Sequence, residues 1–284
     1  MVDSKMKYPQ SSSLGISSSA SINVHLRLKS PNENPRMKPV AVICLLNLAP
    51  LASCEEKQKS APAVIDPTIP PGEPRAKAAA ANVRPALERD LSIVGLKFGD
   101  PVFIRAFKEE RQLELFVRNR ATGKFDLFRT YPIAAASGGP GPKLAEGDRQ
   151  VPEGFYIVPP AAMKPDSVFH LAFNIGYPNE FDRAHQRGGS AIMVHGNHVS
   201  TGCLAMTDGK IEEIYTLCAA AHAGGQAFFR VHLFPFRMTA ERMQKAAGDP
   251  NEDFWKNLRQ GYDLFEKNHV PADVSVADGC YQFR

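Results

Sequence analysis

The residues best placed to do chemistry lie in one short segment, residues 191–208. Its apolar start, Ala191-Ile-Met-Val194, predicts a buried strand that ends at His195, and a loop then leads to Cys203. A thiol becomes a nucleophile when it loses its proton, and an imidazole held beside it can take that proton and stabilise the thiolate. The pair therefore predicts nucleophilic acyl transfer, with Cys203 as nucleophile and His195 as general base.

Two neighbouring features would support a thiolate at Cys203. Gly202 lets the backbone approach a substrate closely, so the N–H groups of Gly202 and Cys203 are the expected oxyanion-hole donors. The apolar spacing of residues 211–218 predicts a helix directly after this segment, with Thr207 or Asp208 as its cap. The dipole and free N–H groups of that helix would favour negative charge on the sulfur.

Other interpretations of these side chains stay open. His198 lies between His195 and Cys203 and is an alternative base, although a strand end holds a side chain more rigidly than a loop. A zinc site of His195, His198 and Cys203 is conceivable, but the spacing fits no familiar zinc finger and no fourth ligand stands out. We therefore expect neither a metal nor an organic cofactor.

The N-terminal part of the chain has the pattern of an export leader followed by a tether. Residues 1–36 are rich in serine and without pattern, so we expect a mis-called extension ahead of a true start at Met37. Residues 37–53 have the basic start, apolar run and small final residues of a signal peptide. Residues 54–74 are rich in proline and predict a semi-extended tether.

The end of the apolar run, Leu51-Ala-Ser-Cys54, resembles the lipobox of bacterial lipoproteins, which implies lipid modification of Cys54. Glu55 rather than aspartate follows it, and by the same resemblance this favours the outer membrane. We therefore expect a periplasmic lipoprotein that touches the membrane only through its lipid anchor. An ordinary apolar strand with a chance cysteine is the alternative.

The positive charge of the chain belongs to this leader. The formal net charge is +4, but residues 1–53 hold six of the 34 Lys and Arg and only two of the 30 Asp and Glu. The remainder is therefore close to neutral, and we expect no nucleic-acid partner.

The cysteine count also points to a free thiol. Cys44 and Cys54 belong to the leader, so three cysteines remain, and an odd number in an oxidising compartment leaves at least one unpaired. Cys218 falls on the apolar face of its predicted helix and is expected to be buried. Whether it pairs with Cys280 is left open.

Short apolar runs separated by turn residues predict a mainly β fold of the α+β class over residues 75–284. We expect a sandwich or barrel-like core with flanking helices, including a C-terminal helix. The expected strands are 102–107, 113–117, 125–133, 155–158, 168–173, 191–194 and 228–233, and the expected helices are 75–93, 211–218 and 254–265.

The His-Gly pair followed by Ser-x-Gly-Cys resembles the signature of the L,D-transpeptidases with a YkuD-type catalytic domain. The resemblance extends to the YafK-like branch of that family and covers about residues 85–284. Its further segments are Val102–Arg105, Val151–Tyr156, Phe169–Pro178, Val194–Gly196, Phe254-Trp255 and Gly261–Asp263.

The resemblance implies that Cys203 forms a thioester at the L,D bond of peptidoglycan stem peptides, after the diaminopimelate residue. By position in the motif, Ser200 would orient the site. The chain departs from the common pattern at Thr201 and Ala205, where histidine and arginine are frequent. These departures put the contact to a substrate carboxylate in doubt, and Arg183 or Arg187 could supply it.

The acceptor of the acyl group is left open by the resemblance. An amine from another stem would make the protein a transpeptidase. Water would make it a hydrolase that detaches a peptidoglycan-linked lipoprotein, which is then a partner. A catalytically silent peptidoglycan-binding lipoprotein is a third hypothesis, of a different class.

Overall fold

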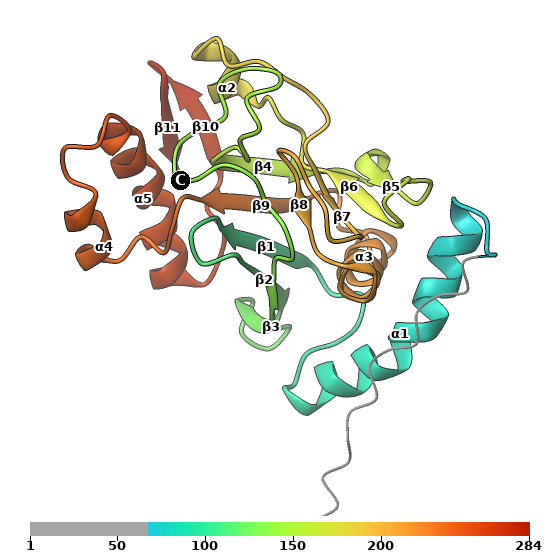
Figure 1. The fold of residues 1–284 in the computed structure, drawn as a ribbon. Helices are drawn as coiled ribbons and strands as arrows, with labels where there is room; N and C mark the ends of the chain where they lie inside the picture. Colours follow the sequence, from blue (N-terminus) through green and yellow to red (C-terminus); the bar gives the residue numbers. More distant parts are fainter. Residues whose placement is uncertain (1–67) are drawn as a thin grey trace, which may run out of the picture. The chain divides into compact units, whose positions relative to one another are not determined.

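The computed structural model describes residues 68–284. The predicted extension 1–36, the predicted signal segment 37–53, the expected lipidation site Cys54 and the predicted tether up to residue 67 lie outside the described residues. The described chain begins with the helix α1 (Glu73–Ile93) and continues into two sheets that share one hydrophobic core (Figure 1).

The larger sheet has five strands in the order β3-β2-β1-β9-β4. All its neighbours are antiparallel except β1 and β9, which run parallel. The strands are β1 (Val102–Phe107), β2 (Gln112–Arg118), β3 (Phe125–Pro132), β4 (Gly154–Val158) and β9 (Phe229–Phe234). Strand β9 comes late in the chain and pairs with β1, which comes early. The sheet therefore links the N-terminal and C-terminal parts of the described chain.

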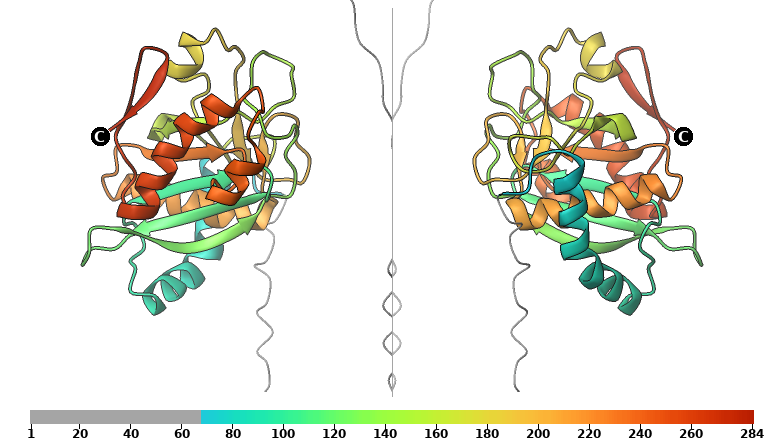
Figure 2. Two further views of the ribbon diagram at one scale, coloured as in Figure 1. Left: turned by 90° about the vertical axis from the view of Figure 1, so that its left-hand side faces the viewer. Right: turned by 90° about the vertical axis from the view of Figure 1, so that its right-hand side faces the viewer.

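Both faces of this sheet are covered, and this explains why β1 is almost uniformly apolar. Side chains alternate between faces along a strand. Val102 and Ile104 enter the main core with the helix α3 (Asp208–Ala223), whereas Phe103 packs on Phe265 of the helix α5 (Glu252–Asn268), with ring centroids 4.7 Å apart. The two helices lie on opposite faces of the sheet (Figure 2).

The smaller sheet has four strands in the order β5-β6-β7-β8. They are β5 (Met163–Lys164), β6 (Ala172–Asn174), β7 (Met193–His195) and β8 (Leu204–Ala205), and the pair β7–β8 is parallel. Helix α3 contacts β1, β6 and β7, and α1 packs on α3. These layers confirm the predicted α+β class with a mainly β core and flanking helices.

Several elements differ from the sequence-based expectation. The chain ends in a hairpin, β10 (Val274–Ala277) and β11 (Cys280–Phe283), rather than in α5. The signal for its turn was Asp278-Gly279, a pair that suits the positive φ angles of 51° and 71° found there. The short helices α2 (Glu180–Ala184) and α4 (Ala240–Lys245) were also not predicted.

One predicted strand is much shorter than expected. Over residues 168–173 only the end is extended, as β6, and the side chain of Val168 is 90% exposed. Pro85 lies inside α1 and does not interrupt it. Trp255 is buried and packs against Phe236, with ring centroids 5.2 Å apart.

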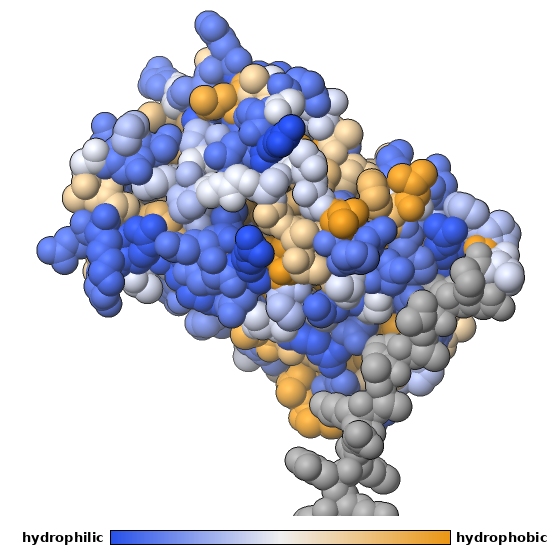
Figure 3. Space-filling model, viewed as in Figure 1, coloured by the Kyte–Doolittle hydropathy of each residue, from blue (hydrophilic) through white to orange (hydrophobic). Residues whose placement is uncertain are grey.

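No helix within residues 68–284 is both long and apolar enough to cross a bilayer. The face drawn in Figure 3 is mainly hydrophilic, with hydrophobic residues in small separate patches. Single exposed hydrophobic residues and small patches of this kind are ordinary on folded proteins.

A buried ion pair connects the larger sheet to the loop after β3. The Lys108 ammonium donates to Glu153 at 3.0 Å and to the carbonyl oxygens of Gly141 at 2.6 Å and Val151 at 2.8 Å. The other carboxylate oxygen of Glu153 accepts the indole N–H of Trp255 at 2.8 Å. The pair therefore joins the end of β1, the loop and α5.

Replacing Glu153 with glutamine should destabilise the fold, because Lys108 would then be buried without a counter-charge. We expect a loss of about 3 kcal/mol in the free energy of unfolding, measured by urea denaturation with circular dichroism. The matched control is Glu241→Gln, which breaks an exposed pair with Lys245 and should change nothing measurable. Equal stability of the two variants would contradict the role of the buried pair.

Candidate active site

The parallel pairing of β7 and β8 brings the segments that carry His195 and Cys203 side by side. His195 is level with Ala205 in the register, and Cys203 precedes Ala205 by two residues. Continued back by one residue, this register sets Cys203 beside Met193, two residues before His195. The backbone N–H of Met193 confirms the alignment, because it donates to the sulfur of Cys203 at 3.3 Å.

The imidazole of His195 is held in a defined orientation. His195 is only 2% exposed, and the centroid of its ring lies 4.8 Å from that of Phe169. Nδ1 lies 2.6 Å from the carbonyl oxygen of Gly196, so Nδ1 carries the proton and Nε2 keeps a free lone pair. Burial lowers the pKa of His195, and the Gly196 carbonyl only partly opposes this. A neutral imidazole with a free Nε2 is suited to act as a base.

The thiol of Cys203 is not hydrogen-bonded to His195 in this structure. Its Sγ accepts the Met193 N–H and lies 3.6 Å from the carbonyl oxygen of Ala191, to which it donates. Burial raises the pKa of Cys203, while the Met193 N–H and the charge of Lys143 act in the opposite direction. The expectation that an imidazole lowers this pKa is therefore wrong for the resting site, where thiol and imidazole are both neutral.

The loop after His195 is held by the first residue of α3. The carboxylate of Asp208 accepts the N–H of Asn197 at 2.7 Å. Gly196 fits tightly between neighbours, because a Cβ there would lie 2.6 Å from Asp208 Oδ1 and 2.7 Å from the Phe169 carbonyl oxygen. No side chain larger than glycine fits this position without a shift.

The helix begins where the cap residues predicted it, with Thr207 as N-cap residue, but it does not follow Cys203 directly. Strand β8 comes first, and α3 begins only at Asp208. Thr207 is the N-cap residue, but its side chain makes no capping hydrogen bond. The Asp208 carboxylate in the first turn serves the Asn197 loop, so we assign no role to the dipole of α3 at Cys203.

Two serine hydroxyls accept hydrogen bonds from the N–H groups that were expected to form the oxyanion hole. Gly202, at φ +84°, donates its N–H to Ser137 Oγ at 2.6 Å. The N–H of Cys203 donates to Ser200 Oγ at 3.1 Å. A substrate oxygen would have to replace one or both hydroxyl groups. Ser137 is a site residue that sequence reasoning missed.

A cleft of about 470 Å³ opens beside Cys203. Its walls are residues 190–192, residues 201–203 and the loop that contains Lys143 and Arg149. Lys143 is 3% exposed, and its ammonium donates to Asp148 at 2.7 Å and to the Ala145 carbonyl oxygen at 2.8 Å. Sequence reasoning did not select this loop, although its Gly147-Asp148 pair marks a turn.

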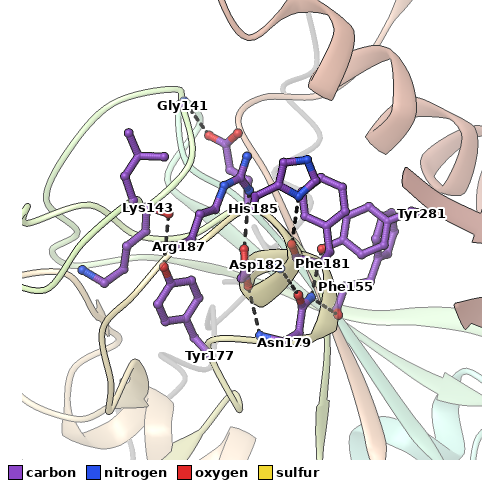
Figure 4. A network of polar contacts seen from close by, with 12 residues as sticks. Gly141, Lys143, Phe155, Tyr177, Asn179, Phe181, Asp182, His185, Arg187 and Tyr281 are labelled. Carbon is purple, nitrogen blue, oxygen red and sulfur yellow. Dashed lines mark hydrogen bonds and ion pairs between the residues drawn. The ribbon is translucent and has the colours of Figure 1, made fainter. Parts of the chain in front are cut away.

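The structure does not bring Arg183 or Arg187 into this cleft. Arg187 pairs with the buried Asp182 at 3.4 Å, and its guanidinium lies over the rings of Phe181 and Phe254. Figure 4 shows this network around Asp182. Arg183 donates to the carbonyl oxygen of Pro178 and lines a separate cleft of about 620 Å³ beside β4 and β10. The expectation that one of them contacts a substrate carboxylate beside Cys203 does not fit this geometry.

His198, Cys218 and Cys280 do not line the Cys203 cleft. His198 is exposed on the loop, and only its backbone N–H is bonded, to Asn197. Within residues 68–284, no group of three His, Cys, Asp or Glu side chains is arranged to hold a metal. Cys218 is buried in the core and Cys280 is exposed, and both are free thiols, as is Cys203.

Replacing Gly196 with alanine should damage the site, because the new Cβ would collide with Asp208 and the Phe169 carbonyl oxygen. We expect a loss of about 2 kcal/mol in stability, measured by thermal unfolding. Gly209→Ala is the matched control, since a Cβ there meets nothing within 4 Å and alanine favours the helix. Tolerance of the Gly196 change would show that the loop is not held as described.

The raised pKa of Cys203 predicts slow alkylation by iodoacetamide at neutral pH. The rate should increase as the pH rises through and beyond the ordinary thiol pKa of about 8.5, because only the thiolate reacts. The measurement is mass spectrometry of the Cys203 peptide after timed exposure at several pH values. A rate that is already at its plateau near pH 6 would instead indicate a thiolate–imidazolium pair.

Comparisons with known proteins agree with the predicted resemblance. The family model of the L,D-transpeptidase catalytic domain, YkuD, matches residues 101–250. "Putative L,D-transpeptidase YafK" of Escherichia coli strain K12 is 45% identical over 183 residues, which is 64% of this chain and 74% of that protein, and the protein of the same name in strain O157:H7 gives the same values.

Solved structures are more distant. The helical cell shape determining protein Pgp2 of Campylobacter jejuni has a TM-score of 0.37 and 17% identity over 68% of this chain and 80% of its own. Bd1075 of Bdellovibrio bacteriovorus has a TM-score of 0.34 and 19% identity, over 60% and 58%. Scores of this size indicate only a loose similarity. The match to more than half of the chain and the 45% identity to the Escherichia coli proteins show that this chain belongs to the L,D-transpeptidase family with a YkuD-type catalytic domain.

Proposed function

We propose that this protein cleaves the L,D peptide bond of peptidoglycan stem peptides through a thioester on Cys203. The observation that carries the proposal is the register of β7 and β8, which brings the segments of His195 and Cys203 side by side. Cys203 borders an open cleft, and His195 has a free Nε2. Membership of the L,D-transpeptidase family supports peptidoglycan stem peptides as the substrate class.

In the first half-reaction, His195 Nε2 takes the proton of Cys203 while the sulfur attacks the carbonyl carbon of diaminopimelate in its bond to D-alanine. Because both groups are neutral at rest, proton transfer accompanies the attack. The oxyanion displaces the serine hydroxyls and binds the N–H groups of Gly202 and Cys203. The C–N bond then breaks, and the departing D-alanine nitrogen receives the proton from His195.

In the second half-reaction, an acceptor gives its proton to His195 and attacks the thioester. The C–S bond breaks, and the proton returns to the sulfur of Cys203. An amine from another stem peptide makes a crosslink, whereas water makes a hydrolysed tripeptide. We take transpeptidation as the primary proposal, and hydrolytic release of a peptidoglycan-linked lipoprotein as the alternative.

The proposal places the protein in the periplasm. Its support is the sequence of the leader, whose basic start, apolar run and Leu51-Ala-Ser-Cys54 ending suit a lipoprotein signal. Cys54 would carry the lipid that anchors the protein to the outer membrane. Proteins of this kind act on peptidoglycan from the membrane side without spanning the bilayer.

The test is mass spectrometry of products after incubation with purified muropeptides. Tetrapeptide monomers and lipoprotein-linked tripeptides are supplied in parallel reactions. Loss of D-alanine with new dimers establishes a transpeptidase, and release of free tripeptide without dimers establishes the detaching hydrolase. No change in either material would refute both activities and favour a silent binding protein.

Variants of the two histidines identify the base. Cys203→Ala should abolish turnover, and His195→Ala should reduce it by at least about 100-fold, in line with the contribution of a general base. His198→Ala is the matched control and should stay within about threefold of the wild type, because an exposed loop residue adds little to proton transfer at the sulfur. A large loss in His198→Ala with an active His195→Ala would reverse the assignment.

A further inference from the structure

One of the cations that line the cleft beside Cys203 has no ion-pair partner among the described residues. Lys143 and Arg149 are the two basic residues that line it. Lys143 is neutralised by its contact with Asp148. The guanidinium of Arg149 makes no hydrogen bond or ion pair with any residue between 68 and 284, and its side chain is exposed. It is therefore free to bind an anionic group in the cleft.

The backbone of Arg149 is held firmly although its side chain is free. Its φ angle is +59°, in the left-handed region that residues other than glycine rarely adopt. The preceding Asp148 fixes this turn, since its carboxylate accepts the N–H groups of Leu144 at 2.7 Å and Gln150 at 3.0 Å. These contacts, with that of Lys143, lower the pKa of Asp148 to about 2. Asp148 thus stays ionised at any physiological pH.

A single hydroxyl joins Arg149 to the expected oxyanion loop. Ser137 Oγ donates to the carbonyl oxygen of Arg149 at 2.7 Å and accepts the N–H of Gly202 at 2.6 Å. A strained backbone held at a defined place beside a reactive group is typical of functional sites. The arrangement anchors the backbone of Arg149 beside the loop of Gly202 and Cys203, where a substrate carbonyl would react.

No other residue of the cleft can supply this charge. The other basic residue of the cleft, Lys143, is held by Asp148 at 2.7 Å. Glu146 also lines the cleft, and its carboxylate accepts only a long hydrogen bond from Ser190, at 3.5 Å. An unpaired cation and an acid in one cleft suit a ligand that carries both a carboxylate and an ammonium group.

From these contacts we infer that Arg149 binds a carboxylate of the stem peptide beside the bond that is cleaved, and so determines which peptides are accepted. The inference rests on the proposed function. A guanidinium binds a carboxylate through two parallel hydrogen bonds, which adds geometric selectivity to the attraction. The carboxylate belongs either to the terminal D-alanine or to the side chain of diaminopimelate, and the two sources can be tested separately.

The experiment compares the wild-type chain with Arg149→Gln, Arg149→Lys and Arg111→Gln. Arg111 is the matched control, because it is also exposed, has a positive φ of 51° and makes no side-chain hydrogen bond or ion pair within residues 68–284, but does not line the cleft. The substrate is a tetrapeptide monomer. We expect Arg149→Gln to raise KM about 10- to 100-fold with little change in kcat, as for a lost hydrogen bond to a charged group. Arg149→Lys should recover part of this loss, and Arg111→Gln should match the wild type.

Two further substrates identify the carboxylate, one ending in D-alaninamide and one with an amidated diaminopimelate side chain. The effect of Arg149→Gln should disappear with the peptide whose lost carboxylate is the one that Arg149 binds. Persistence of the full effect with both amidated peptides would overturn the inference. So would equal KM values for Arg149→Gln and Arg111→Gln with the unmodified peptide.

The rate of Cys203 alkylation separates this failure from failure of the proposed function. Alkylation needs no stem peptide, so equal rates in all four proteins show that the fold and the nucleophile are intact. An active wild type with an Arg149→Gln variant of unchanged KM overturns only the role of Arg149. A wild type that is alkylated normally but leaves all three peptides unchanged overturns the proposed function and this inference together.

Discussion

The parallel pairing of β7 with β8 is the constraint on which the candidate site depends. Parallel neighbours usually need a long crossover connection, but here a short loop joins the two strands. The loop can turn so sharply because Gly196 has no side chain and because Asp208 binds the N–H of Asn197. Every proposed catalytic contact follows from this turn. It sets the register of His195 against the segment that carries Cys203.

The wall of the cleft depends on a second constraint, the buried charge pair of Lys108 and Glu153. This pair binds the loop after β3 at two carbonyl oxygens and at one N–H. Glu153 also accepts a hydrogen bond from Trp255 of α5, the helix that covers the face of the larger sheet opposite to α3. The C-terminal helix is therefore not a passive cover. It is connected by hydrogen bonds to the loop that presents Arg149 beside Cys203.

Burial acts on both titrating groups of the site in a way that favours their neutral forms. It raises the pKa of Cys203 and lowers that of His195, so each change disfavours an ion pair at rest. Charge then develops only during attack, where N–H groups are positioned to meet it. The cation Lys143 acts in the other direction on the thiol, but its charge is shared with Asp148.

The sequence by itself determined the family, the α+β class and the segment that contains His195 and Cys203. Those features are local, because a strand period, a helix period and a short motif are each written in neighbouring residues. Only the tertiary structure showed that Arg187 is engaged by Asp182 and that Arg149 faces the cleft. Both arginines lie in polar loops, and a loop sequence does not show which way a side chain points. The pKa of Cys203 was likewise decided by burial, which depends on residues far away in the chain.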